Sequence, residues 1–150
     1  MIDLGPWDLP RRPSKDEWGF LVASAVGTRG ECTRRQVGAI IVDTEGRIAG
    51  AGYNGSYPGG PSCLEGACPR GSSGVLPGSQ YDTGPGACHA VHAELNALLD
   101  VSEKARLAGA TLYVTAEPCD GCLKILRNTA IRRIYHLDEE GVPDARVWPF

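Results

Sequence analysis

Two short clusters of metal-ligating residue types lie in the second half of this 150-residue chain. His92 lies in the first, and Cys119 and Cys122 lie in the second. The C-x-x-C spacing lets two thiolates bind one metal ion, and a neutral histidine adds a nitrogen ligand. Three protein ligands leave one coordination position open, which is typical of a catalytic zinc site rather than a closed structural one. The sequence therefore predicts a catalytic Zn²⁺ site at these three residues.

A carboxylate accompanies the first cluster. Glu94 follows His92 by two residues and is not needed as a fourth ligand. A free carboxylate beside water activated by zinc can act first as a general base and then as a general acid. The pattern H-x-E…P-C-x-x-C is typical of zinc deaminases, in which water replaces the amino group of an aminated ring. A zinc knuckle that only stabilises the fold would leave Glu94 and Pro118 unexplained, so we expect a hydrolytic deaminase with Glu94 as the proton carrier.

Both clusters are expected at the start of helices. One helix is predicted from His92 to about Ala108, with an apolar stripe that includes Leu99, and another from Pro118 and Cys119 to about residue 128. Free N–H groups at a helix start favour a thiolate, and proline is tolerated there. Side chains two apart diverge in mid-helix, but near a helix start His92 and Glu94 can still face one pocket.

The remaining pattern predicts an α/β fold. Ser14 and Glu17 form a capping box that starts a helix over 14–28. Apolar runs predict strands at 37–42, 47–53, 111–115 and 131–136. Residues 1–13 read as an extended arm, and 137–150 show no clear last helix or strand. This order favours a single domain over 1–150, a three-layer α/β/α sandwich on a mixed sheet of four or five strands, with parallel crossovers from about residue 111.

The segment 54–88 is a long loop rich in glycine and proline, which fill 14 of the 34 positions from 54 to 87. A loop of this length in a compact domain is usually functional, disordered or held by a cross-link. Cys63 and Cys68 lie in this loop and Cys88 is its last residue. A metal ion bound by these cysteines would offset part of the entropy cost of ordering the loop.

Composition limits the partners. Fifteen Lys and Arg face eighteen Asp and Glu, and this net charge of −3 favours a small substrate over nucleic acid. A local basic group remains at Arg29, Arg34 and Arg35. The start lacks a signal-peptide pattern, and no apolar run is long enough to span a membrane. We therefore expect a cytoplasmic protein without a membrane partner, in which six cysteines favour metal binding over disulfides.

Taken together, these motifs resemble those of the deoxycytidylate deaminases of the cytidine deaminase superfamily, including the related proteins named after the late competence operon. His-Ala-Glu at 92–94 and Pro-Cys-x-x-Cys at 118–122 are shared by the superfamily, and Gly-Tyr-Asn-Gly at 52–55 is specific to this branch. The resemblance implies that His92, Cys119 and Cys122 bind zinc and that Glu94 shuttles protons. It also implies substrate contacts from Asn54 and the backbone of Ala93, and homo-oligomers, often hexamers.

A second, structural zinc is also expected. The resemblance implies an extra zinc held from the positions of Cys32 and Cys63 in some relatives. Cys68 and Cys88 would complete a Cys₄ set here, which is the composition of a closed structural site. The alternative is that these are free, buried thiols. His89 is a spare candidate that is better explained as an ordinary surface residue.

The leading functional hypothesis is conversion of dCMP to dUMP with release of ammonia. One alternative is a related zinc deaminase that acts on a modified cytosine nucleotide, a nucleoside, a free base or a nucleoside antibiotic. Another is a non-catalytic, zinc-stabilised binding module, against which the intact Glu94 argues. Two departures from the family concern the substrate: Glu117 before Pro118, as in tRNA adenosine deaminases and riboflavin-pathway deaminases, and the short tail. A dCMP enzyme also needs cationic or N–H groups for the phosphate, and Arg29, Arg34 and Arg35 are the candidates.

Overall fold

The computed structural model describes residues 11–149 except 73, 77–82 and 85. Residues 1–10 of the predicted arm lie outside this range. None of the helices in the described part of the chain is long and apolar enough to cross a membrane. The single-domain prediction for residues 1–150 stays a prediction.

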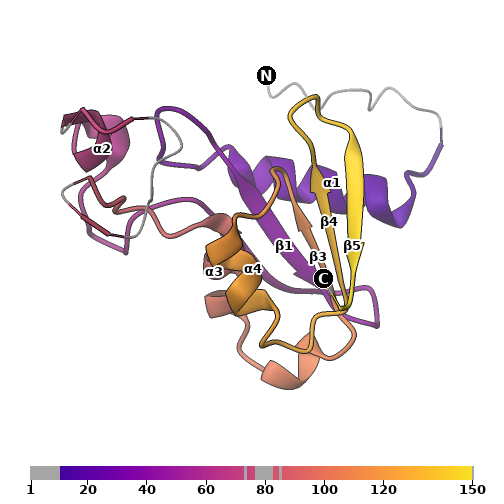
Figure 1. Cartoon of the computed structure of the whole chain (residues 1–150). Helices are drawn as coiled ribbons and strands as arrows, with labels where there is room; N and C mark the ends of the chain where they lie inside the picture. Colours follow the sequence, from indigo (N-terminus) through magenta and orange to yellow (C-terminus); the bar gives the residue numbers. More distant parts are fainter. Residues whose placement is uncertain (1–10, 73, 77–82, 85, 150) are drawn as a thin grey trace.

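A five-stranded mixed sheet forms the centre of the fold, in the order β2-β1-β3-β4-β5 (Figure 1). Its strands are β1 (Gly38–Val42), β2 (Ile48–Tyr53), β3 (Thr111–Val114), β4 (Arg133–Leu137) and β5 (Pro143–Val147). β3 and β4 are parallel, as the predicted crossover requires, and the other neighbours are antiparallel. The mixed sheet is therefore confirmed in its five-stranded form.

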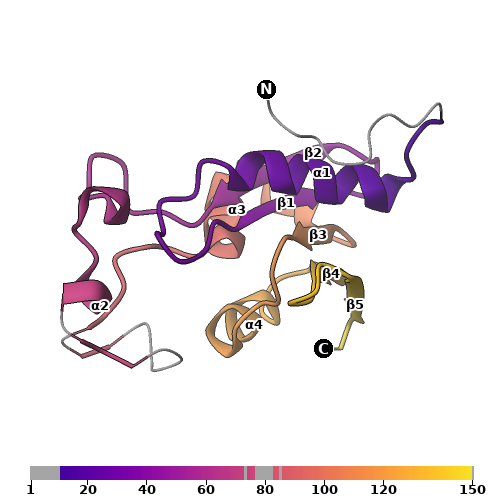
Figure 2. The same cartoon turned by 90° about the horizontal axis from the view of Figure 1, so that it is seen from above.

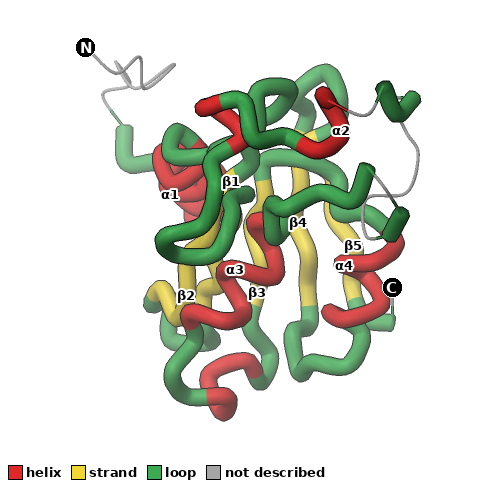
Figure 3. Tube along the Cα trace, turned by 90° about the vertical axis from the view of Figure 1, so that its left-hand side faces the viewer, coloured by secondary structure: helices red, strands yellow, loops and turns green. Residues whose placement is uncertain are grey.

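Helices cover both faces of the sheet, which confirms the three-layer architecture (Figures 2 and 3). α1 (Lys15–Gly27) lies on one face, and α3 (Ala93–Asp100) and α4 (Asp120–Leu126) lie on the other. Alternate residues of β1 serve the two layers: Ile40 packs in the cluster with α1, and Ile41 packs in the cluster with α3 and α4. This is the period of two that a strand buried on both faces must show.

α1 begins as the sequence predicts. Ser14 is the N-cap: its hydroxyl accepts from the N–H of Glu17 at 3.1 Å, and the Glu17 carboxylate accepts from the N–H of Ser14 at 2.6 Å. Arg11 also donates to this carboxylate, which holds the pKa of Glu17 well below its usual range, at about 2.

Three features differ from the prediction. The helix expected from His92 to Ala108 ends at Asp100, whose carboxylate accepts from the N–H of Ala51 in β2 at 3.0 Å, and a short 3₁₀ helix (Lys104–Leu107) then leads to β3. Leu99, predicted on the buried stripe, is 79% exposed. The tail, in which the sequence shows no clear strand, forms β5, which pairs with β4 from Leu137↔Pro143 to Arg133↔Val147.

Small residues let α3 approach the sheet closely. A Cβ atom on Gly52 of β2 would lie 2.3 Å from the backbone N of Ala97 and 2.6 Å from the carbonyl oxygen of Ala93. Both distances are well inside ordinary van der Waals contact. The position of the first turn of α3 therefore depends on glycine in the neighbouring strand.

The loop over 54–88 leaves one end of the sheet and returns to it (Figure 1). Its described parts contain a 3₁₀ turn (Cys63–Glu65) and the short helix α2 (Pro69–Ser72). Gly55 and Val91 exchange two backbone hydrogen bonds, which bring the two ends of the loop together next to the start of α3.

Candidate active site

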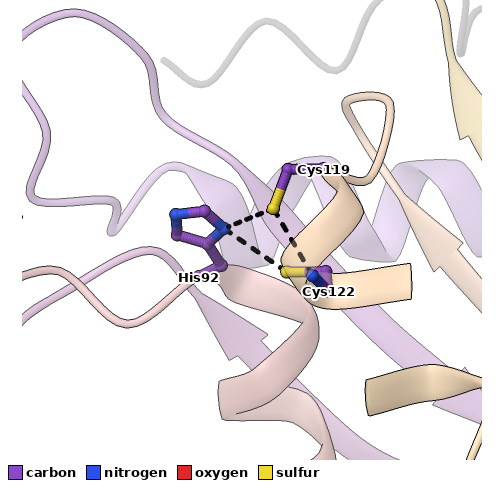
Figure 4. Close-up of side chains that lie close together, drawn as sticks. All are labelled: His92, Cys119 and Cys122. Carbon is purple, nitrogen blue, oxygen red and sulfur yellow. Dashed lines mark hydrogen bonds between the residues drawn. The ribbon is translucent and has the colours of Figure 1, made fainter. Parts of the chain in front are cut away.

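Two helix starts bring the predicted ligands together. His92 is the N-cap of α3, and Cys119 is the N-cap of α4, with Cys122 in the first turn of that helix (Figure 4). The Nδ1 atom of His92 lies 3.4 Å from Sγ of Cys119 and 3.3 Å from Sγ of Cys122. Within the described residues, this is the one group of three His, Cys, Asp or Glu whose ligand atoms all lie within 4.8 Å of one another.

The geometry fits zinc. Zn–S bonds of about 2.3 Å and Zn–N bonds of about 2.0–2.1 Å at tetrahedral angles place sulfur and nitrogen about 3.6 Å apart. The two observed sulfur–nitrogen distances are within a few tenths of an ångström of that value. A small rearrangement of the three side chains therefore accommodates the ion, with Nδ1 as the histidine ligand.

Glu94 lines the same cavity as the ligands His92 and Cys119. It is only 4% exposed, lies in the first turn of α3, and its carboxylate is within hydrogen-bonding reach of the Cys122 thiol. Burial raises its pKa, and the nearby His92 partly opposes that shift. The predicted convergence of His92 and Glu94 on one pocket at a helix start is confirmed, because both line the same cavity.

Burial outweighs the helix start at Cys122. We expected helix N-termini to favour the thiolate form, but desolvation raises the pKa of Cys122 strongly, and the neighbouring carboxylate of Glu94 adds to this effect. Cys122 is only 1% exposed. A metal cation supplies the positive charge that stabilises a thiolate in such a place.

The cavity lined by His92, Glu94 and Cys119 has a volume of about 420 Å³. Ala93 and Asn54 both line it, as do Arg34 and Arg35, whereas Arg29 is exposed and lies outside its lining. A second, wider cleft of about 750 Å³ adjoins it, and the two share lining residues at Arg35, Val37, Ala116, Glu117 and Cys119.

Asn54 has a structural role that the sequence did not reveal. Its Oδ1 accepts from the N–H of Val37 at 2.8 Å, and its Nδ2 donates to the carbonyl of Arg35 at 2.8 Å. The amide thus anchors the segment that enters β1. Its contact with substrate, like that of the Ala93 backbone, stays a prediction.

The four remaining cysteines all line this same cavity. Burial raises the pKa of Cys63 to about 11, and the neighbouring thiol of Cys68 adds to this shift. The pKa of Cys68 is lowered, chiefly by the N–H of Gly71. All four cysteines belong to the described residues, but no three of their Sγ atoms all lie within 4.8 Å of one another, as the ligand atoms of His92, Cys119 and Cys122 do. The second zinc therefore stays a prediction. His89 is exposed, as expected.

Two residues near the site were missed from sequence. Arg70 in α2 is 3% exposed and lines the cavity, with its guanidinium donating to the carbonyls of Gly86 and Leu76. Arg146 in β5 forms an ion pair with Glu117, two residues before the Cys119 ligand. Neither lies in a recognisable motif, and only the fold brings them to the site.

Comparison with known proteins agrees with this geometry. Residues 13–137 match the family described as the cytidine and deoxycytidylate deaminase zinc-binding region. A deoxycytidylate deaminase from Mycobacterium phage D29 is 43% identical over 129 residues, covering 85% of this chain and 98% of the relative. One from Schizosaccharomyces pombe is 36% identical over 126 residues, covering 83% of this chain but only 38% of the relative.

A solved structure adds to this comparison. The dCMP deaminase of cyanophage S-TIM5, in complex with dCMP and dUMP, is 26% identical, with a TM-score of 0.59 over 85% of this chain and 84% of that one. The matched family region includes all three residues of the candidate metal site and Glu94. The chain therefore belongs to the cytidine and deoxycytidylate deaminase family, and His92, Cys119 and Cys122 form its candidate catalytic zinc site.

Proposed function

We propose that this chain is a zinc-dependent deaminase that converts dCMP to dUMP and ammonia. The observation that carries the proposal is the buried carboxylate of Glu94 beside a set of three zinc ligands, two of which, His92 and Cys119, line the same cavity as Glu94. The near-complete coverage of the phage D29 relative, which is named a deoxycytidylate deaminase, supports the choice of substrate.

His92, Cys119 and Cys122 would hold the zinc, and Glu94 would move the protons. When bound, Zn²⁺ lowers the pKa of a coordinated water and so supplies a nucleophile near neutral pH. Glu94 accepts the proton of the water that adds to C4 of the cytosine ring. Glu94 would pass this proton to N3, then accept the second proton from the hydroxyl group now on C4 and deliver it to the amino group, which leaves as ammonia as the C4 carbonyl forms. One carboxylate would thus serve in both directions. Its low exposure keeps bulk water away from this proton path.

Replacing Glu94 with glutamine tests this role directly. We expect Glu94→Gln to keep its zinc and to lose dCMP turnover by at least about 10²- to 10⁴-fold, the usual contribution of a general acid–base group. Glu103→Gln is a matched control, because Glu103 is exposed and makes no side-chain cap bond. Ammonia release and zinc content are measured on both variants. Full activity of Glu94→Gln would exclude the proposed mechanism.

The substrate is tested with a panel of purified compounds. Ammonia release is compared for dCMP, deoxycytidine, CMP, cytosine, adenosine and guanine with zinc-loaded protein. A dCMP rate far above that for deoxycytidine supports the proposal. Activity only on an unphosphorylated or purine compound would favour the alternative of a related deaminase that acts on another substrate. Bound zinc without turnover of any of the six compounds would favour a deaminase that acts on a modified or specialised ring.

We further propose that Cys32, Cys63, Cys68 and Cys88 hold a second, structural zinc. Their common place in the cavity lining supports this. So does the N–H of Arg34, which donates to Sγ of Cys32 at 3.4 Å, because such bonds stabilise thiolate ligands. Metal analysis should give two zinc ions per chain, and Cys68→Ser should lose one while keeping the catalytic ion. A count of one in fully loaded wild type would exclude the second site.

We also propose that the chain acts in the cytoplasm as a homo-oligomer, with a hexamer as the expected form. Exposed apolar side chains on β5 and after it, Val147 at 53% and Trp148 at 42%, support an interface on that edge. Size-exclusion chromatography with light scattering measures the mass of the particle in solution, and a monomer at micromolar concentration would contradict the proposal.

A further inference from the structure

Arg35 lies at the boundary between the two cavities of the site. It is the only arginine or lysine that lines both of them within the described part of the chain. Resting on the proposed function, we propose that Arg35 selects substrates that carry a 5′-phosphate, by binding that phosphate at the mouth of the inner cavity. The inner cavity takes the base, because Glu94 and two of the three metal ligands, His92 and Cys119, line it.

The backbone holds Arg35 in place. The carbonyl of Arg35 accepts from Nδ2 of Asn54, and the N–H of Val37 donates to Oδ1 of the same side chain, both at 2.8 Å. Asn54 is itself 8% exposed. The exposed guanidinium of Arg35 therefore extends from a fixed point, which lowers the entropy cost of binding an anion.

Arg35 and Arg34 differ in the groups that they face. The charge of Arg34 acts on Cys68, in the cysteine cluster, whereas the charge of Arg35 acts on Glu94. Arg35 forms no ion pair or hydrogen bond through its side chain with any described residue. Its donors are thus available to a ligand that enters the inner cavity, and a guanidinium matches the geometry of phosphate oxygens.

The outer cleft fixes the direction of the phosphate. Four carboxylates line it, although one of them, Glu117, is paired with Arg146. The other three are Asp120, Asp138 and Glu139. A phosphate dianion placed among them would be repelled, whereas a phosphate on the inner side meets Arg35. This asymmetry also disfavours a polynucleotide, since its next phosphate would have to cross the acidic side.

The test compares discrimination rather than activity alone. The ratio of kcat/KM for dCMP to kcat/KM for deoxycytidine should fall about 10- to 100-fold in Arg35→Gln, the range expected for loss of hydrogen bonds to a charged group. Arg35→Lys should recover part of the ratio, because it keeps the charge but loses the fork of donors. Arg29→Gln is the control, since it removes the same charge from an exposed position outside both cavities. An unchanged ratio in Arg35→Gln, or an equal fall in Arg29→Gln, would overturn the proposal.

A binding measurement separates this proposal from the proposed function. Affinities of dCMP and deoxycytidine are measured by calorimetry on zinc-loaded Glu94→Gln, with and without Arg35→Gln. If wild type does not turn over dCMP, the proposed function fails. The role of Arg35 is still supported if dCMP binds more tightly than deoxycytidine and Arg35→Gln removes that difference. Equal affinity for the two compounds, or a difference that survives in Arg35→Gln, would overturn it.

Discussion

Gly52 offers the most direct test of how the fold positions the catalytic helix. In Gly52→Ala the new methyl group would lie 2.3 Å from the backbone N of Ala97 and 2.6 Å from the carbonyl oxygen of Ala93. Ordinary contact begins at 3.4 Å, so α3 must move away from β2 by about 1 Å. Both clashing atoms belong to the backbone and cannot rotate away. We therefore expect a destabilisation at the upper end of the usual range for overpacking, about 3 kcal/mol.

The shift affects both stability and activity. About 3 kcal/mol corresponds to a fall in Tm of roughly 6–12 °C for a chain of this size. Ala93 is the first residue of α3 and Glu94 the second, so the same shift displaces the proton carrier. A misplacement of about 1 Å can reduce a rate by about 10²-fold.

Calorimetry and dCMP turnover on zinc-loaded protein measure the two effects of Gly52→Ala. Gly71→Ala is the control, because its methyl group would lie 3.7 Å from the nearest atom, in ordinary contact, and its backbone is not in the left-handed region. If Gly52→Ala melted within about 1 °C of wild type and kept its turnover, the argument that β2 sets the position of α3 would be wrong.

Three further predictions concern single groups. In zinc-free protein, iodoacetamide should alkylate Cys68 before Cys63, because the pKa of Cys68 is lowered while burial raises the pKa of Cys63 to about 11. Bound zinc should protect both thiols from alkylation. Mass spectrometry measures the order, and a faster reaction of Cys63 would contradict the prediction. Asp43→Asn should lower Tm at pH 7, since the N–H of Arg47 holds the pKa of Asp43 below its usual value. A carboxylate whose pKa is lowered by folding stabilises the protein above its unfolded pKa, near 4, and this stabilisation is lost as the pH falls through the folded pKa. The difference in Tm between wild type and variant should therefore shrink in acid, and a constant difference would refute the assignment. Tyr113→Phe removes a hydrogen bond to the Asp16 carboxylate of α1 and should lower the free energy of unfolding, measured by urea denaturation, by about 1.5–3 kcal/mol. An unchanged free energy would mean that water replaces that bond without loss.

The catalytic motif could be predicted from sequence because its chemistry is local. His92 and Glu94 lie within one turn of a helix start, and Cys119 and Cys122 lie within another, so spacing alone limits where their side chains point. Only the meeting of the two helix starts needed the fold. The parallel pair β3–β4 brings the two helix starts together, because α4 directly follows β3 and so begins at the end of the sheet where the site lies.

Other features could not be predicted because they depend on distant partners. The side chains of β5 are almost all exposed, so the strand lacks the apolar alternation that identifies a strand, and its pairing with β4 alone defines it. The early end of α3 depends on a bond from Asp100 to a strand 49 positions earlier. The family motif predicts a substrate contact for Asn54, whereas its amide hydrogen bonds to the backbone of Arg35 and Val37 depend on the folded loop.

Burial makes the site depend on its metal. Desolvation raises the pKa values of both Cys122 and Glu94, so without a cation burial disfavours the charged form of each group. Zinc binding must then release the proton of Cys122, and the same positive charge favours the carboxylate of Glu94 that the reaction requires. An exposed site would bind zinc with a smaller proton penalty, but it would also let solvent protons reach the reacting ring. The buried arrangement instead couples the loading of the metal to the state of the proton carrier, since the charge that ionises the ligand also prepares the base.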